Sequence, residues 1–505
     1  MNNQHTLIWR RKVIWACGLA SGIVFADMIA LNTALPFIQD DLKIDSVDTY
    51  WLSEIYLLFL ASLVLVGGTL SDCWGQYKIF IIGVIGFGLS SLLCALSNSG
   101  DTLIFSRALQ GISAALLAPS SLAMIRLWSE DDENKAVANW VKISSMIIPL
   151  GPIIGGISVQ FFSWHWIFAA NIPVSLMILW LLKNVPPRMN IKKKQVDWAG
   201  GIVITLALIC LIVAVLEHAR DALNALQFIS LIFAGLILLF IFIRIQKKST
   251  SPMLPPILFK SRAFVLVNLQ TLLMFGSFQA AIFFVPFLLV QIFEYSGLEA
   301  GAAFFPISIA VIALSGSIGK LADRFGTHVF LTLGPLMMGA AIFGLSFADH
   351  SWRYWPNFFI YVCLLSLGVA FIVVPLTTAA MNAIERERSG LAAGVNNACA
   401  RLSVLLCIAA MGWILLQGFR KRLKDISQDY HLTTNIFEQA AHSLAEIEKT
   451  IQSLDIADET KLQLYHHIEY AYFASYSEMM YLAAFICAVS SVLGWYSTNR
   501  KHKTT

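Results

Sequence analysis

One carboxylate, Asp27, lies inside the apolar run from Ile14 to Phe37, which is long enough to cross a bilayer. Placing a carboxylate at membrane depth costs about 2.5–3.5 kcal/mol on insertion scales. Acids in such positions usually face a water-filled cavity, where they bind a proton, an ion or a cation. We therefore expect Asp27 to be functional, and a static buried ion pair is the competing interpretation.

Two further ionisable residues, Glu54 and Arg107, lie at comparable depth in other apolar segments. At about 1.5 Å per residue, Asp27 is roughly 15 Å from the C-terminal end of its segment, and Glu54 and Arg107 are roughly 8 Å from the N-terminal ends of theirs. Successive segments alternate in direction, so these ends share one side. We hypothesise a proton-coupling set in which protonation of Asp27 releases Arg107, with Glu54 as a second acid. A structural helix-to-helix bond for Arg107 and an outer-surface position for Glu54 stay open.

The composition indicates an all-α membrane protein. The chain is 57% hydrophobic and only 13% charged, about half the charged fraction of a soluble domain. Apolar runs of spanning length recur along almost all of its 505 residues, and we count about fourteen. Inside lipid the backbone must satisfy its own polar groups, so these runs are expected to be transmembrane helices.

Basic residues predict the orientation of these helices. Lysine and arginine gather at both ends of the chain and in the even-numbered connections, which places both termini in the cytoplasm. One group opposes this pattern, because it would lie outside after the thirteenth helix: Arg420, Lys421, Arg422 and Lys424. Long loops cross largely regardless of charge, so we keep the orientation.

The predicted organisation has three parts. Residues 1–183 form an N-terminal six-helix bundle, residues 184–261 a two-helix insertion with cytoplasmic linkers, and residues 262–505 a C-terminal six-helix bundle. The second bundle contains a polar outer loop at about 418–473, in which Phe437 to Leu454 has apolar residues at helical spacing. This loop is expected to be helical. Capping the outer mouth, contacting a partner and lying on the surface are its open roles.

The two bundles share an internal repeat. The second helix ends in GTLSDCWGQYK, Gly68 to Lys78, and the tenth in GKLADRFGTH, Gly319 to His328. Both read G-x-L-[SA]-D-x-x-G at equivalent places in their six-helix units. Repeats of this kind are typical of secondary transporters, with the substrate site at the repeat interface. The candidate gating residues are Gly68, Asp72, Gly75, Gly319, Asp323, Arg324 and Gly326.

Further motifs carry a family resemblance. They are DMIALNTALP (27–36), WLSEIYLL (51–58), RALQG (107–111), GPIIGG (151–156), WHWIFAANIP (164–173) and DWAG (197–200). In this order they resemble the fourteen-helix drug:proton antiporter family of the major facilitator superfamily, of the EmrB and QacA type. The resemblance implies two six-helix pseudo-repeat bundles, two extra central helices and proton-coupled export from the cytoplasmic (inner) membrane.

The resemblance also implies roles for particular residues. The gating motif would lock the two halves on the cytoplasmic side, although Cys73 and Gln76 stand where the family has basic residues. Glu54 replaces a usual threonine. The glycine-rich motif would add bending or leak control to close helix packing, through Gly151, Pro152, Gly155 and Gly156.

Aromatic residues in these helices are candidates for a cavity that binds lipophilic cations. They are Trp51, Tyr56, Trp140, Phe275 and Phe278. A lipid-facing or core position is the competing interpretation for each of them.

The remaining patterns restrict the function class. The sequence has no G-x-x-x-x-G-K-[ST] loop for ATP and no His/Cys metal cluster, so we expect no enzyme, no cofactor and a proton gradient as the energy source. The net charge of +4 follows from the basic cytoplasmic loops and does not suggest nucleic acid. We expect an exporter of a small organic compound, with a periplasmic adaptor protein as a possible partner. The alternatives are a dedicated exporter of a siderophore, lipid or other metabolite, and a membrane sensor without transport.

Overall fold

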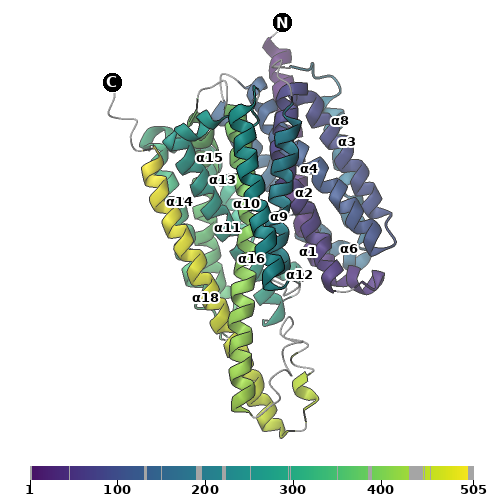
Figure 1. The fold of residues 1–505 in the computed structure, drawn as a ribbon, viewed down its shortest axis with the longest axis vertical. Coiled ribbons are helices and arrows are strands. Elements are labelled where there is room, and N and C mark those ends of the chain that lie inside the picture. Colours follow the sequence, from purple (N-terminus) through teal and green to yellow (C-terminus); the bar gives the residue numbers. More distant parts are fainter. Residues whose placement is uncertain are drawn as a thin grey trace.

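The computed structural model is a helical bundle (Figure 1). It describes residues 3–44, 46–129, 133–148, 150–188, 196–218, 223–250, 252–293, 295, 297–349, 351–384, 389–430, 447, 450–454 and 456–498. Within these ranges the chain forms helices and no strand, as expected for an all-α protein.

The helices fall into three consecutive groups. The first group is α1 (Asn3–Leu42), α2 (Ser46–Trp74), α3 (Gln76–Ala95), α4 (Gly100–Trp128), α5 (Glu133–Ile147), α6 (Leu150–Phe161), α7 (His165–Ala169) and α8 (Asn171–Leu182). The second is α9 (Trp198–His218), α10 (Ala225–Lys248) and η1 (Pro256–Lys260). The third is α11 (Arg262–Gln291), α12 (Gly297–Ala302), α13 (Phe305–Phe325), α14 (Thr327–Leu345), η2 (Tyr354–Phe358), α15 (Phe359–Asn382), α16 (Ser389–Asp429) and α18 (Asp458–Thr498).

Twelve helices in the described ranges are long and apolar enough to cross a membrane. The two other predicted spans are the fifth, which consists of two short helices, α5 and α6, and the seventh, which is the 21-residue apolar helix α9. The expected architecture of about fourteen spans is therefore confirmed, and it differs in detail at the fifth span.

The first and third groups form two bundles of the same design. In the first, α4 packs between α2 and α3, and in the second, α15 packs between α13 and α14. The bundles meet where α2 faces α16 and α5 faces α13. Helices α9 and α10 pack together, and α9 contacts both α2 and α16, so the extra pair lies across the junction (Figure 1).

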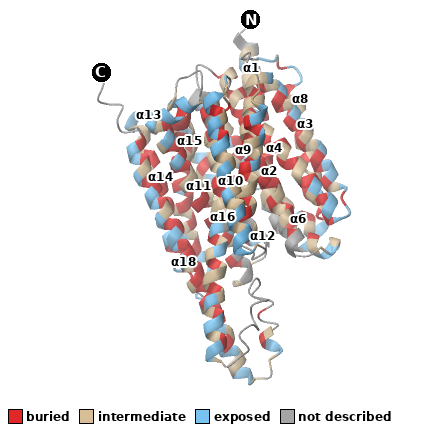
Figure 2. Cartoon of the chain, viewed as in Figure 1, coloured by how far each residue is buried: buried red, intermediate tan, exposed pale blue. Residues whose placement is uncertain are grey.

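Burial follows this arrangement. Buried residues gather where helices face one another, whereas α10 turns large apolar side chains outward (Figure 2). Examples are Leu226, Ile229, Phe233, Leu236 and Phe240. Such faces are suited to lipid and unsuited to water.

Both ends of the chain lie at the same end of the bundle in Figure 1. At the opposite end, α16 and α18 extend beyond the other helices. Within the polar segment at about 418–473, which was expected to be helical, α16 continues to Asp429 and α18 begins at Asp458. Of the helix expected from Phe437 to Leu454, residues 437–446, 448 and 449 lie outside the described ranges.

Contacts between α16 and α18 explain why these two helices continue beyond the other helices. Phe419 of α16 packs edge-on against Tyr472 of α18, with ring centroids 5.4 Å apart. The guanidinium of Arg422 lies 2.5 Å from the carboxylate of Glu478 and also donates to Ser475. One of the four basic residues that opposed the predicted orientation is thus paired with an acid of the neighbouring helix.

The internal repeat has the same backbone conformation in both copies. Gly75, between α2 and α3, has φ 95° and ψ 132°, and Gly326, between α13 and α14, has φ 90° and ψ 137°. Residues with a Cβ atom rarely adopt this conformation. The two copies also place Gly68 near Pro119 of α4 and Gly319 near Val374 of α15. The sequence repeat is therefore a structural repeat.

Replacing either turn glycine is expected to destabilise the protein. Gly75→Ala and Gly326→Ala should each cost about 1–3 kcal/mol, because alanine is strained at these backbone angles. Thermal unfolding of the purified protein measures this loss. Gly319→Ala is the matched control, since an added Cβ would come no closer than 3.8 Å to Val374. Equal stability of all three variants would contradict the argument.

Candidate functional site

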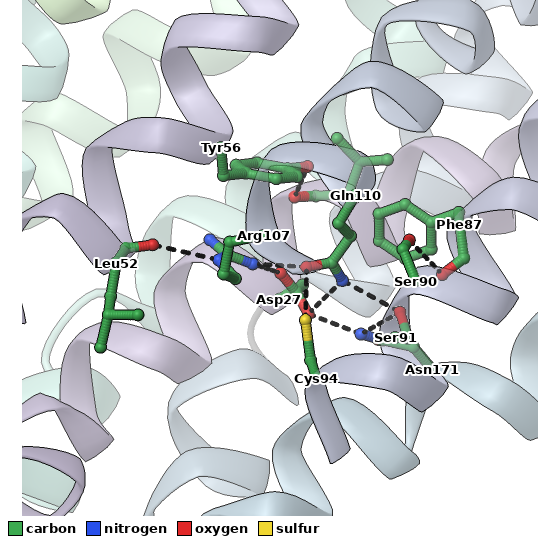
Figure 3. Close-up of polar contacts among 11 residues, drawn as sticks. Asp27, Leu52, Tyr56, Phe87, Ser90, Ser91, Cys94, Arg107, Gln110 and Asn171 are labelled. Atoms are coloured by element: carbon green, nitrogen blue, oxygen red, sulfur yellow. Dashed lines mark hydrogen bonds and ion pairs between the residues drawn. The ribbon is translucent and has the colours of Figure 1, made fainter. Parts of the chain in front are cut away.

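Asp27 of α1 and Arg107 of α4 form a buried ion pair (Figure 3). One carboxylate oxygen, Oδ2, lies 2.5 Å from the guanidinium Nη1, and both side chains have 0% exposure. The expected contact between these residues is thus present. A pair of this kind, out of reach of water, persists only where further hydrogen bonds satisfy the remaining polar atoms.

Two amide side chains supply those bonds to the other carboxylate oxygen. Gln110 Nε2 donates to Asp27 Oδ1 at 3.0 Å, and Asn171 Nδ2 donates to the same atom at 2.5 Å. Both amides also donate to the hydroxyl of Ser91, at 3.0 and 3.4 Å. Asp27 therefore accepts three side-chain hydrogen bonds, from residues of α4 and α8.

The guanidinium of Arg107 is held from several sides. Its Nε donates to the carbonyl of Leu52 on α2 at 3.1 Å, and Nη1 also donates to Gln110 Oε1 at 2.7 Å. The ring of Tyr56 lies 4.4 Å from the guanidinium carbon, within cation–π range. Within the described part of the chain, Arg107 Nη2 has no hydrogen-bond partner.

Close helix packing brings these side chains together. A Cβ atom on Gly111 of α4 would lie 2.4 Å from the carbonyl oxygen of Tyr56, so glycine is required where α4 crosses α2. A Cβ atom on Gly151 of α6 would lie 2.6 Å from the carbonyl oxygen of Ala26, directly beside Asp27. The packing role expected for Gly151 is consistent with this contact. Gly155 is buried, Gly156 is half-buried, and the side chain of Pro152 lies outside the described set.

The other predicted residues lie in different places. Glu54 is buried on α2, two residues after Leu52, and its role as a second acid stays a prediction. Tyr56 belongs to the group of residues around Asp27 and Arg107, called the Asp27 site below. Its hydroxyl donates to the carbonyl of Val24. Trp140 packs against α1, where its indole donates to Ser21 at 3.1 Å. Trp51, Phe275 and Phe278 belong to or pack against the apolar core, and their cavity role is also untested.

Sequence reasoning did not single out the amides. Gln110 lies three residues after Arg107, so it shares a helix face with the arginine, and this spacing could have identified it. Asn171 comes from α8, and Ser91 comes from α3. No spacing rule connects them to Asp27, because their contact depends on how four helices pack.

A separate groove of about 600 Å³ lies between the end of α14 and α18. Its lining includes Phe347, Asp349, Glu469, Phe473 and Tyr481. None of its lining residues belongs to the Asp27 site.

Comparison with known proteins gives the family. Residues 17–407 match the model of the Major Facilitator Superfamily. The chain belongs to this superfamily. It is therefore a multi-pass membrane protein of a transporter family, and the resemblance inferred from the motifs is confirmed at this level.

Similar proteins include drug-resistance transporters. The chain is 28% identical over 436 residues to the multidrug resistance protein Stp of Mycobacterium tuberculosis, covering 86% of this chain and 80% of Stp. It is 28% identical over 431 residues to the tetracenomycin C resistance and export protein of Streptomyces glaucescens, covering 83% and 79%. The fold resembles that of the human organic anion transporter MFSD10, with TM-score 0.57, 15% identity and coverage of 95% and 99%.

Removing one partner of the buried pair is expected to be costly. Arg107→Leu should destabilise the protein by about 3–5 kcal/mol if Asp27 stays ionised, because a buried charge loses its counter-charge. Adding Asp27→Asn should restore most of this loss, since the amide carries no charge. Thermal unfolding at neutral pH of the two single variants and the double variant gives the coupling.

The control acid is Asp40, which is exposed on the same helix. Asp40→Asn should give Arg107→Leu no such rescue. Additive effects of Asp27→Asn and Arg107→Leu would show that the two charges do not stabilise each other.

Proposed function

We propose that this protein is a proton-coupled exporter of organic compounds, especially lipophilic or cationic drugs. The observation that carries the proposal is the Asp27–Arg107 pair, which is fully buried inside one bundle of a transporter fold. The names of the similar proteins support a drug-type cargo. The proposed location is the cytoplasmic (inner) membrane, with both termini in the cytoplasm, and a periplasmic adaptor protein remains a proposed partner.

Protonation is the proposed switch. An ionised Asp27 holds Arg107 and so ties α1 to α4 and, through Leu52, to α2. A proton on Asp27 removes the charge that attracts the guanidinium. Arginine cannot give up its own proton in exchange, so the released cation must find another partner. A cationic cargo and this cation would repel each other, which links proton entry to cargo release. Glu54 is proposed as a second acid in the same half of the bundle.

Alternating access is proposed to occur between the bundles 1–183 and 262–505, with residues 184–261 as the insertion between them. The contacts of α2 with α16 and of α5 with α13 would rearrange as the bundles rock. The two repeat motifs, with Asp72 and with Asp323 and Arg324, are proposed to lock the cytoplasmic side. The cargo is proposed to contact the aromatic residues Trp51, Tyr56, Trp140, Phe275 and Phe278.

A narrower exporter is the alternative. One similar protein is named for resistance to a single compound, tetracenomycin C, which favours a cargo of restricted structure in some relatives. A resistance screen of cationic dyes and biocides separates the two proposals. Resistance to several unrelated compounds supports drug export, and resistance to none supports a dedicated exporter of a siderophore, lipid or other metabolite.

Coupling is expected to depend on Asp27. In everted vesicles with an imposed pH gradient, a transported compound should evoke proton efflux, and Asp27→Asn should reduce this efflux to the level of vesicles without the protein. Asp40→Asn, the same change at an exposed position of α1, should leave it unchanged. Normal coupling in Asp27→Asn would refute the proton switch. A membrane sensor would tolerate the substitution.

A further inference from the structure

Asn171 is the one contact in the described part of the chain through which α8 holds the Asp27 carboxylate. Its Nδ2 donates to Asp27 Oδ1 at 2.5 Å, and the residue is only 6% exposed (Figure 3). The amide belongs to the first residue of α8, and α7 ends two residues earlier, at Ala169. Asn171 thus links α1, which carries the acid, to α8. None of the hydrogen bonds of Arg107 described above involves α8.

Asparagine and arginine respond differently when a carboxylate gains a proton. The guanidinium has hydrogen-bond donors and no acceptor, so it cannot accept a hydrogen bond from a protonated carboxyl group. The asparagine side chain has both a donor and an acceptor, and a half-turn of its amide group exchanges them. Asn171 can therefore donate to the carboxylate and accept from the carboxylic acid at nearly the same position.

We propose that Asn171 is a positioning residue that keeps Asp27 attached to α8 in both protonation states, so that proton binding releases the α4 arginine alone. In the ionised state, Asn171 Nδ2 donates to Asp27 Oδ1. In the protonated state, the new hydrogen on Oδ1 is donated to Asn171 Oδ1. The ion pair with Arg107 is then broken, whereas the hydrogen bonds that join Asp27 Oδ1 to Asn171 of α8 and to Gln110 of α4 remain.

The other ionisable groups around Asp27 come from different helices. They are Arg107 on α4, the thiol of Cys94 on α3 and Tyr56 on α2, which stacks on Arg107. Cys94 donates its thiol hydrogen toward Gln110 Oε1, and the Tyr56 hydroxyl is bonded to Val24. Helices α6 and α8 contain no ionisable residue. The contribution of α8 to the protonation of Asp27 therefore comes from an amide and not from a charge.

The proposal rests on the proposed function, because it needs Asp27 to titrate, but its test needs no cargo. Infrared difference spectra of the purified protein in lipid nanodiscs, recorded against pH, report the carbonyl band of a protonated carboxyl group. The Asp27 band is the one that disappears in Asp27→Asn. Its pH midpoint and frequency are the two readouts.

Asn171→Leu is expected to move this midpoint upward by about one pH unit, because the carboxylate loses one charge-assisted hydrogen bond. The carbonyl band of the protonated form should also shift to higher frequency, since its hydrogen bond is lost. Asn171→Ser retains a group that donates and accepts, so its midpoint should lie between those of the wild type and Asn171→Leu. Ser175→Ala, one turn along α8, should shift neither readout, because the Ser175 hydroxyl donates to the backbone oxygen of Asn171 and, among the described residues, has no hydrogen bond with Asp27 or with the Asn171 amide.

The outcomes separate the two claims. An Asp27 band whose midpoint and frequency are the same in Asn171→Leu and in the wild type overturns the role of Asn171 and leaves the proton switch intact. Shifts of equal size in Ser175→Ala and Asn171→Leu also overturn it, because they would mean a general effect of altering α8. Absence of any Asp27 band over the accessible pH range overturns both.

Discussion

The ion pair between Asp27 and Arg107 is the constraint on which the N-terminal bundle depends. Two charges without access to water are tolerable only as a pair with their remaining atoms satisfied. The chain meets most of this requirement with donors from α4 and α8 and with a carbonyl acceptor from α2, and among the described residues Arg107 Nη2 is the atom of the pair without a partner. The pair therefore fixes how several helices approach one another. Any event that neutralises one charge removes an electrostatic interaction that stabilises this arrangement.

Helix packing in turn makes the pair possible. Gly111 and Gly151 lie where α4 meets α2 and where α6 meets α1, and a Cβ atom at either position would collide with a backbone carbonyl. The collisions would fall beside Tyr56 and Ala26, which are neighbours of the charged side chains. Small residues thus serve here as the means by which long polar side chains reach one another across helices. In the second bundle, α11, α13 and α15 repeat the architecture. Their described residues contain no buried ion pair like that of Asp27 and Arg107.

Much of the fold could be predicted from the sequence because each feature has a local cause. The length of the apolar runs predicts the spans, and the shared turn motif predicts the two Gly75-like backbone conformations. The Asp27–Arg107 contact could be predicted from the sequence, because buried charges need partners and the rise of a helix fixes the depth of each residue. Asn171 could not be predicted, since its contact with Asp27 depends on how α8 packs, whereas the spacing of Gln110 from Arg107 could have identified Gln110. The segment at about 418–473 was expected to be helical, but the sequence did not show that α16 would continue to Asp429 and α18 begin at Asp458.

The central claim is that protonation of Asp27 sets the relative position of the two bundles. Spin labels at the exposed positions Leu96 and Trp355, in a variant without competing cysteines, report the distance between the bundles at the end away from the termini. The account predicts that acid changes this distance in the protein with Asp27, and that Asp27→Asn has the acid-state distance at every pH. A distance in Asp27→Asn that still follows pH as in the unaltered protein would contradict it.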